Sequence, residues 1–145
     1  MKDIIEHWDE EHGVARCIIN YKTRSGIELN GIGIAECSSE DSDFMSERTG
    51  SVIAEYRAEI DLIRKINKYE IKPAIAALKH VYCTMVKSKR YNSDSYEAIR
   101  LKKELAHLMD EFEENKNMIA SLKTDLNFYM DSKDKFYKEL RKGQN

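Results

Sequence analysis

The chain has 145 residues, of which 41% are hydrophobic and 34% are charged, and its net charge at pH 7 is −2. This balance is poor for one large compact core and typical of long helices that bury a single apolar stripe. The negative net charge argues against a nucleic-acid polymer as partner, because such partners select for basic surfaces. No segment reaches the roughly 18 consecutive apolar residues of a membrane helix, and the acidic N-terminus does not resemble a signal peptide.

Charge and cysteine usage narrow the expectations further. Residues 1–56 carry 5 Lys or Arg and 12 Asp or Glu, whereas residues 57–103 carry 12 and 5. This asymmetry indicates either a contact between acidic and basic parts of different subunits or an anion site in the middle segment; basic residues that solvate helix faces are the alternative. Cys17, Cys37 and Cys83 share no metal-ligand spacing and are typical of reduced thiols, so we expect a cytoplasmic protein.

The first predicted elements are two β-strands, Val14–Tyr21 and Ile27–Cys37, joined by a polar turn at residues 22–26. Both segments are rich in β-branched residues, and the second alternates between apolar and polar positions. A shift of this alternation at Asn30-Gly31 predicts a β-bulge. Two strands alone are marginally stable in water, so the antiparallel hairpin must pair with another chain or pack on a helix.

Two short motifs in this region have weak functional interpretations. His7 and His12 are five positions apart and do not share a helical face, so we expect an exposed amphipathic start and no metal site. Gly31-Ile32-Gly33 resembles part of a dinucleotide-binding fingerprint, but the third glycine is missing and an acidic loop follows. We expect instead that these glycines allow another backbone or a ring to pass close to the strand.

The middle helices are expected within residues 44–92, with Ser46 or Asp43 as the N-cap and Gly50 as a point where another backbone can approach closely; the helical pattern breaks from Lys87 to Ser95. Pro73 indicates either a new helix from about Glu70 or a kink in one long helix. Apolar residues recur at helical spacing on both sides of this break: Ile53, Tyr56, Ile60 and Ile63 before it, and Ile71, Ile75, Leu78, Tyr82 and Met85 around and after it.

The last predicted helix, within residues 93–145, has an unbroken three-four spacing over more than five heptads. Its seam positions are 98, 101, 105, 108, 112, 115, 119, 122, 126, 129, 133, 136 and 140. Such a seam is typical of a coiled coil, and the polar seam residues Asn115 and Lys133 can fix register and partner number. The helix would extend roughly 65–70 Å and must pack on the middle helices or on a neighbouring subunit. The expected fold is therefore α+β, one structural domain, in a homo-oligomer of two or more chains.

A cationic and aromatic cluster follows the second apolar stripe. Its members are Lys87, Lys89, Arg90, Tyr91 and Asn92, followed by Arg100, Lys102 and Lys103. Cations for phosphates, an aromatic ring for a base and an amide for ring edges are what a nucleotide pocket requires. A small anion held between subunits fits the acidic chain better than a polymer does, and an ordinary basic loop is the alternative.

Catalytic patterns are weak. Cys83 lies three positions after His80 beside an apolar stripe, so we expect a core thiol and not an activated nucleophile. The carboxylates are numerous, but no apolar pocket that would raise a pKa is evident around them. The sequence therefore predicts a protein that is not an enzyme and that uses no cofactor or metal.

One stretch resembles a known family. It comprises Gly31-Ile32-Gly33-Ile34-Ala35-Glu36-Cys37, then Glu40-Asp41 and Phe44, then Gly50, and finally Ile53-Ala54-Glu55-Tyr56-Arg57-Ala58. This is similar to small phage proteins with a G-x-A-x-C strand, an acidic turn ending in Phe and a helix that opens G-x-x-I-A-x-x-R-A. The pattern resembles the first-described Thoeris anti-defence family over about residues 30–58 and in the plan of a hairpin followed by long helices.

The resemblance implies a non-enzymatic protein that acts in the host cytoplasm and sequesters a cyclic ADP-ribose-type signal, with cyclic oligonucleotides as a related class. Arg57 is the motif position suited to phosphate, because a guanidinium can bind a pyrophosphate bidentately; pairing with Asp61 is the alternative. Tyr82 and Asn92 lie outside the matched motif, where the family plan would place a stacking ring and a base-reading amide. The alternative function is a coiled-coil structural or adaptor protein of a phage.

Overall fold

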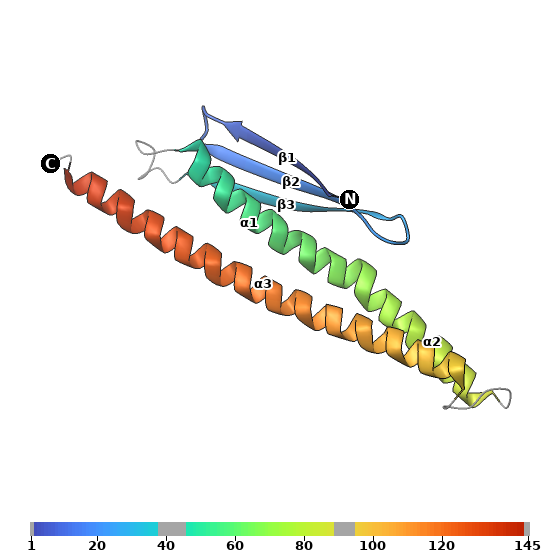
Figure 1. Cartoon of the computed structure of the whole chain (residues 1–145). Coiled ribbons are helices and arrows are strands. Elements are labelled where there is room, and N and C mark those ends of the chain that lie inside the picture. Colours follow the sequence, from blue (N-terminus) through green and yellow to red (C-terminus); the bar gives the residue numbers. More distant parts are fainter. Residues whose placement is uncertain (1, 38–45, 89–94, 144–145) are drawn as a thin grey trace.

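The computed structural model describes residues 2–37, 46–88 and 95–143. Its elements, in chain order, are β1 (Lys2–Asp9), β2 (Val14–Lys22), β3 (Glu28–Glu36), α1 (Glu47–Ile66), the π-helical turn η2 (Asn67–Ile71), α2 (Lys72–Lys87) and α3 (Tyr96–Gly143). Figure 1 shows α1 between the sheet and α3, whereas α2 and the first part of α3 extend beyond the sheet as a helical pair. The α+β prediction with a long C-terminal helix is confirmed.

The sheet has three antiparallel strands in the order β1-β2-β3, so the predicted two-stranded hairpin is incomplete. Residues 2–9 add a strand whose partners run from Lys2↔Tyr21 to Asp9↔Val14. A tight turn reverses the chain after β1: Gly13 has φ 64°, and the Asp9 carboxylate accepts a hydrogen bond from the His12 N–H at 3.2 Å. The side chains of β1 are mostly exposed, as expected for this segment. Because neither face of the strand is buried, its sequence does not show the alternation of apolar and polar residues that marks a half-buried strand.

No bulge interrupts β2 and β3, because their register is continuous from Val14↔Glu36 to Lys22↔Glu28. The bulge prediction was wrong for a physical reason. The buried positions of β3 are occupied partly by small residues, Gly31, Gly33 and Ala35, while Ile32 and Ile34 point to the outer face and are 45% and 44% exposed. The change in apolar phase thus reflects a close helix contact and not an extra residue.

The close contact lies between β3 and α1. A Cβ atom added to Gly31 would overlap the Ala58 carbonyl oxygen, and one added to Gly33 would overlap the Ala54 carbonyl oxygen. Ala54 and Ala58 are themselves fully buried against the strand. The expectation that the strand glycines admit another backbone is therefore confirmed, and α1 is held unusually close to the sheet.

Helices α1 and α2 form one continuous rod joined by η2 (Figure 1). Of the two alternatives at Pro73, the structure therefore has one long helix and not a separate helix that begins near Glu70. The Lys72 N–H bonds to the Asn67 carbonyl, five residues back, so the helix widens by one residue in this turn. Pro73 lies in the first turn of α2, where its missing N–H and fixed φ are tolerated. The rod continues without a sharp turn.

Helix α3 runs antiparallel to this rod, and its 48 residues correspond to roughly 72 Å. Its predicted seam faces the rod of the same chain through most of its length: Ala98, Leu108 and Leu126 are buried. The polar seam residue Asn115 donates to the Oδ1 of buried Asn67 at 2.8 Å. Near the end the buried position shifts to Tyr137, whereas the predicted seam residue Phe136 is 60% exposed.

Candidate functional site

Arg57, the predicted phosphate ligand, lies on α1 beside the edge of β3 that does not pair with β2. Its Nη1 donates to the Ile34 carbonyl oxygen at 2.6 Å. Asp61, which was the alternative partner of Arg57, instead forms an ion pair with Lys65 at 2.9 Å. A guanidinium has five N–H donors, so the contact with the strand leaves others for a ligand.

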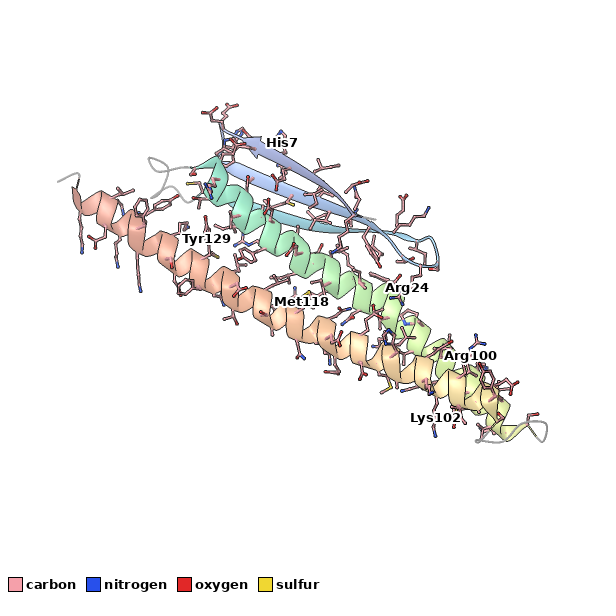
Figure 2. All side chains as sticks on the ribbon, in the orientation of Figure 1. His7, Arg24, Arg100, Lys102, Met118 and Tyr129 are labelled. Carbon is pink, nitrogen blue, oxygen red and sulfur yellow. The ribbon has the colours of Figure 1, made fainter. Side chains whose placement is uncertain are left out.

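Three other predicted site residues, Tyr82, Lys87 and Arg100, lie where α2 ends and α3 begins. Tyr82 and Lys87 are on α2, and the Nζ of Lys102 on α3 lies 5.9 Å from the centre of the Tyr82 ring. Figure 2 shows Lys102 and Arg100 at this end, where the Arg100 Nε is 3.4 Å from a Glu104 carboxylate oxygen. The structure therefore brings cations and an aromatic ring together at the junction of α2 and α3.

Arg57 is remote from this junction in a single chain. It lies 25 positions before Tyr82 along the continuous rod, which corresponds to roughly 37 Å. Arg90, Tyr91 and Asn92 lie outside the described residues. A site that uses both Arg57 and Tyr82 would therefore need contributions from more than one chain.

A hollow that the sequence analysis did not identify opens where the end of α3 passes the start of α1. It has a volume of about 400 Å³ and is lined by Ser46, Thr49, Tyr129, Ser132, Lys133, Phe136, Tyr137 and Leu140. A smaller recess of about 40 Å³ shares Ser46, Thr49, Lys133 and Tyr137 with it and reaches Trp8 and Cys37 of the sheet region. Tyr129 lies on the side of α3 that faces α1 (Figure 2). We call the space between these residues the α1–α3 hollow.

Lys133 provides the positive charge of the α1–α3 hollow. Its side chain is 19% exposed, and its Nζ lies 3.1 Å from the Asp134 carboxylate and 5.5 Å from the centre of the Tyr137 ring. Ser46 caps α1 by accepting a hydrogen bond from the Thr49 N–H at 3.4 Å, as one of the two predicted N-caps. An ammonium group beside a helix N-terminus favours an anion, and the rings provide stacking faces. The hollow suits a ligand that combines negative charge with a planar ring.

The sequence did contain a signal for this hollow. Tyr129, Lys133 and Tyr137 are spaced four residues apart, which places an ammonium group between two rings on one helix face. The spacing of Tyr129 and Lys133 also fits the heptad pattern, which places both residues in the predicted coiled-coil seam. Only the approach of α1 to this face distinguishes a lined hollow from a packed seam.

A cluster of carboxyl groups lies between the exposed middle part of α1 and strand β1. Glu55 is hydrogen-bonded to Glu6 of β1; this bond, partial burial and the negative charges of Glu6 and Glu59 raise the pKa of Glu55 to about 7. Glu55 and Glu59 also line a shallow depression of about 270 Å³. Carboxyl groups near one another are a common origin of a raised pKa.

The cysteines do not provide a nucleophile in this cluster. Burial and the negative charges of Glu6, Glu55 and Glu59 raise the pKa of the Cys17 thiol to about 11, which keeps it protonated near neutral pH. Cys83 is exposed on α2, so the expectation that it is a core thiol was wrong. No residue of α2 is buried in this chain. The position of Cys83 beside the apolar stripe of α2 therefore does not bury its thiol.

The raised pKa of Glu55 leads to a prediction about stability and pH. Because the folded protein favours the neutral carboxyl, this contribution to the free energy of unfolding is complete below the ordinary pKa of 4.5 and is lost as the pH rises through about 7. We expect Glu55→Gln to be more stable than the wild type at pH 8 by about 1 kcal/mol, a value discounted for solvent screening. Near pH 4 the two proteins should differ little. Urea unfolding at both pH values measures the difference.

The matched control for this prediction is Glu114→Gln on the exposed side of α3. This variant should differ from the wild type by the same small amount at both pH values. If Glu55→Gln also showed no dependence on pH, the shared hydrogen bond between Glu6 and Glu55 would be contradicted.

Within the described ranges, no group of three or more His, Cys, Asp or Glu side chains is arranged to hold a metal ion. None of the described helices combines the length and apolar character needed to cross a membrane. In comparisons with known proteins, no family model, no curated protein and no solved structure matches this chain.

Proposed function

We propose that this protein is a non-catalytic binding protein that captures and sequesters a nucleotide-derived signal of the cyclic ADP-ribose type, with cyclic oligonucleotides as a related class. The observation that carries the proposal is the α1–α3 hollow, in which the Lys133 ammonium group lies 5.5 Å from the centre of the Tyr137 ring and Tyr129 and Phe136 also line the space. Phosphates of the ligand bind the ammonium group, and a base stacks on an exposed ring. The resemblance of residues 30–58 to Thoeris anti-defence proteins favours the same ligand class.

In this proposal the protein acts as a homo-oligomer, so that more than one chain encloses each ligand. The cations and ring at the α2–α3 junction and the Arg57 side chain lie far apart within one chain, so their joint use requires neighbouring subunits. Large apolar side chains on α3 remain available for such contacts: Phe128 is 74% exposed and Met118 is 52% exposed. Enclosure between subunits buries most of a small ligand and slows its release, as sequestration requires.

The test of the hollow is the variant Lys133→Met, which keeps the length of the side chain and removes its charge. Loss of a charge-assisted hydrogen bond to phosphate should raise Kd by roughly ten- to a hundredfold for the best-binding cyclic ADP-ribose isomer or cyclic dinucleotide. Isothermal titration calorimetry measures this change. Thermal unfolding of the free protein serves as a check that the variant is folded.

The control is Lys138→Met, a change of the same kind at an exposed position on the same part of α3. It should leave Kd within about twofold of the wild type, since surface substitutions away from a site have small effects. Equal affinity of the wild type and Lys133→Met would remove the α1–α3 hollow from the proposal.

A second candidate function is a coiled-coil structural or adaptor protein of a phage. It is favoured by one observation: α2 has no buried residue in this chain, and its Ile75 and Ala76 line an open groove of about 540 Å³ together with Met109 and Phe112 of α3. Charged side chains of both signs complete the lining: Lys72, Lys79, Asp110 and Glu113. A groove of this kind suits another helix better than it suits a phosphate. The adaptor account predicts no binding to any cyclic nucleotide.

A further inference from the structure

The two edges of the sheet differ in how their backbone groups are satisfied. At the β3 edge, three charged side chains spaced four residues apart on α1 bind the strand backbone: Arg57 to the Ile34 carbonyl at 2.6 Å, Asp61 to the Ile32 N–H at 2.9 Å, and Lys65 to the Asn30 carbonyl at 2.7 Å. A strand edge covered in this way cannot accept a further strand. The β3 edge is therefore closed by its own helix.

Among the described residues, nothing covers the β1 edge in this way. Helix α1 packs over β2 and β3 and barely touches β1, which lies on the side of the sheet away from α3 (Figure 1). No side chain in the described part of the chain hydrogen-bonds to the outer backbone groups of β1. Strand β1 has eight residues, and two of them, Ile4 and Ile5, are 60% and 54% exposed on opposite faces of the strand. An open edge of this length is a template for strand addition.

We propose that the β1 edge pairs with the β1 edge of a second copy of this chain, antiparallel and centred on Ile5, to form a continuous six-stranded sheet. A two-fold axis perpendicular to the sheet makes this contact self-complementary. The inference identifies a surface for the self-association invoked in the proposed function, but it does not depend on any ligand.

The register follows from the residues on the outer face of the sheet. Ile5 pairs with Ile18, and Ile18 pairs with Ile32, so one row of isoleucines crosses all three strands. Pairing centred on Ile5 extends this row through both copies, six side chains in all. Cross-strand pairs of β-branched side chains stabilise a sheet.

Charge complementarity favours the same centre. With Ile5 opposite itself, Asp3 of each chain lies opposite His7 of the other, and Lys2 lies opposite Trp8, so no like charges meet. Centring the pair on Glu6 would place Glu6 opposite itself and Asp3 opposite Asp9, and like charges directly opposite are destabilising. Centring on Ile4 would place Asp3 opposite Ile5 and interrupt the isoleucine row. A second copy thus fits this edge better in the register centred on Ile5 than in the registers centred on Ile4 or Glu6.

The experiment tests the proposed register by disulfide formation between two chains. In a background with Cys17→Ala, Cys37→Ser and Cys83→Ser, the variant Ile5→Cys is treated with diamide and analysed on a non-reducing gel. Residues directly opposite in antiparallel strands have Cα atoms about 4.5–5.5 Å apart, within the range of a disulfide. We expect most of the Ile5→Cys chain to become a covalent dimer at a rate independent of added nucleotide.

Two matched variants make the result specific. Ile34→Cys lies on the same outer face with similar exposure, but at the edge closed by Arg57, and should remain monomeric on the gel. Ile4→Cys, which is opposite Glu6 in the proposed register, should cross-link more slowly than Ile5→Cys. No dimer from Ile5→Cys, equal dimer from Ile34→Cys, or faster reaction of Ile4→Cys would each overturn the proposal.

A second readout does not need cysteine. Ile5→Lys places two ammonium groups opposite each other at the centre of the contact and should raise the Kd of self-association by roughly tenfold or more in sedimentation velocity experiments. Ile34→Lys, the same change on the same face, should leave the Kd unchanged. If both lysine variants associated like the wild type, the β1 edge would not be the contact, whether or not the protein binds a nucleotide.

Discussion

The variant Gly33→Ala is expected to lose about 3 kcal/mol of folding free energy, the upper end of the cost of overpacking a core. The added methyl group would overlap backbone atoms of α1, the Ala54 carbonyl and the Ala58 amide nitrogen, which cannot move aside as a flexible side chain can. Relief requires α1 to move away from the sheet along its length. Urea unfolding followed by circular dichroism measures the loss.

The control is Gly143→Ala, where an added Cβ has no neighbour within 4 Å. This change should alter the free energy of unfolding by no more than about 0.5 kcal/mol, as for most surface substitutions. A loss below about 1 kcal/mol for Gly33→Ala would contradict the close packing of α1 on β3.

The second large effect is expected at the buried amide pair between the rod and α3. Asn67 is 6% exposed, donates to the Phe112 carbonyl at 3.1 Å and accepts from Asn115 at 2.8 Å. Asn115→Leu would leave the oxygen of buried Asn67 without its donor, at a cost of about 2 kcal/mol. Chemical denaturation of the variant measures this cost.

Asn117→Leu provides the comparison, since it makes the same exchange two positions away on the exposed side of α3. It should be close to neutral. The double variant Asn67→Leu/Asn115→Leu should recover part of the loss, because replacing both partners removes the unsatisfied group. Additive losses in the double variant would show that the two amides do not act as a pair.

The helical part of the fold was predictable because its signal is periodic. The seam from Ala98 to Lys133 describes the face that α3 turns towards the rod, and Asn115 was correctly identified as a polar position in that seam. The seam prediction failed at Phe136, because α3 there meets the start of α1 and buries Tyr137 instead. A heptad pattern is a property of one helix. It does not indicate where along that helix the packing partner changes.

The strands were harder to predict because tertiary contacts override their local pattern. In β3, Gly31 and Gly33 occupy the buried positions and Ile32 and Ile34 face outward, so the shift in the apolar alternation was wrongly interpreted as a bulge. β1 was missed because neither of its faces is well covered in one chain. The α1–α3 hollow was also missed: it depends on the approach of Ser46 to Lys133, and these residues are 87 positions apart in the sequence.

The central claim is that the protein binds a nucleotide signal and leaves it chemically intact. The most direct measurement titrates the wild-type protein with cyclic ADP-ribose isomers and cyclic dinucleotides in a calorimeter, then denatures the complex with heat and analyses the released ligand by chromatography. The account predicts tight binding of at least one compound and its recovery unchanged. Recovery of a converted product would indicate an enzyme, and no heat of binding across the panel would contradict sequestration and favour the adaptor account.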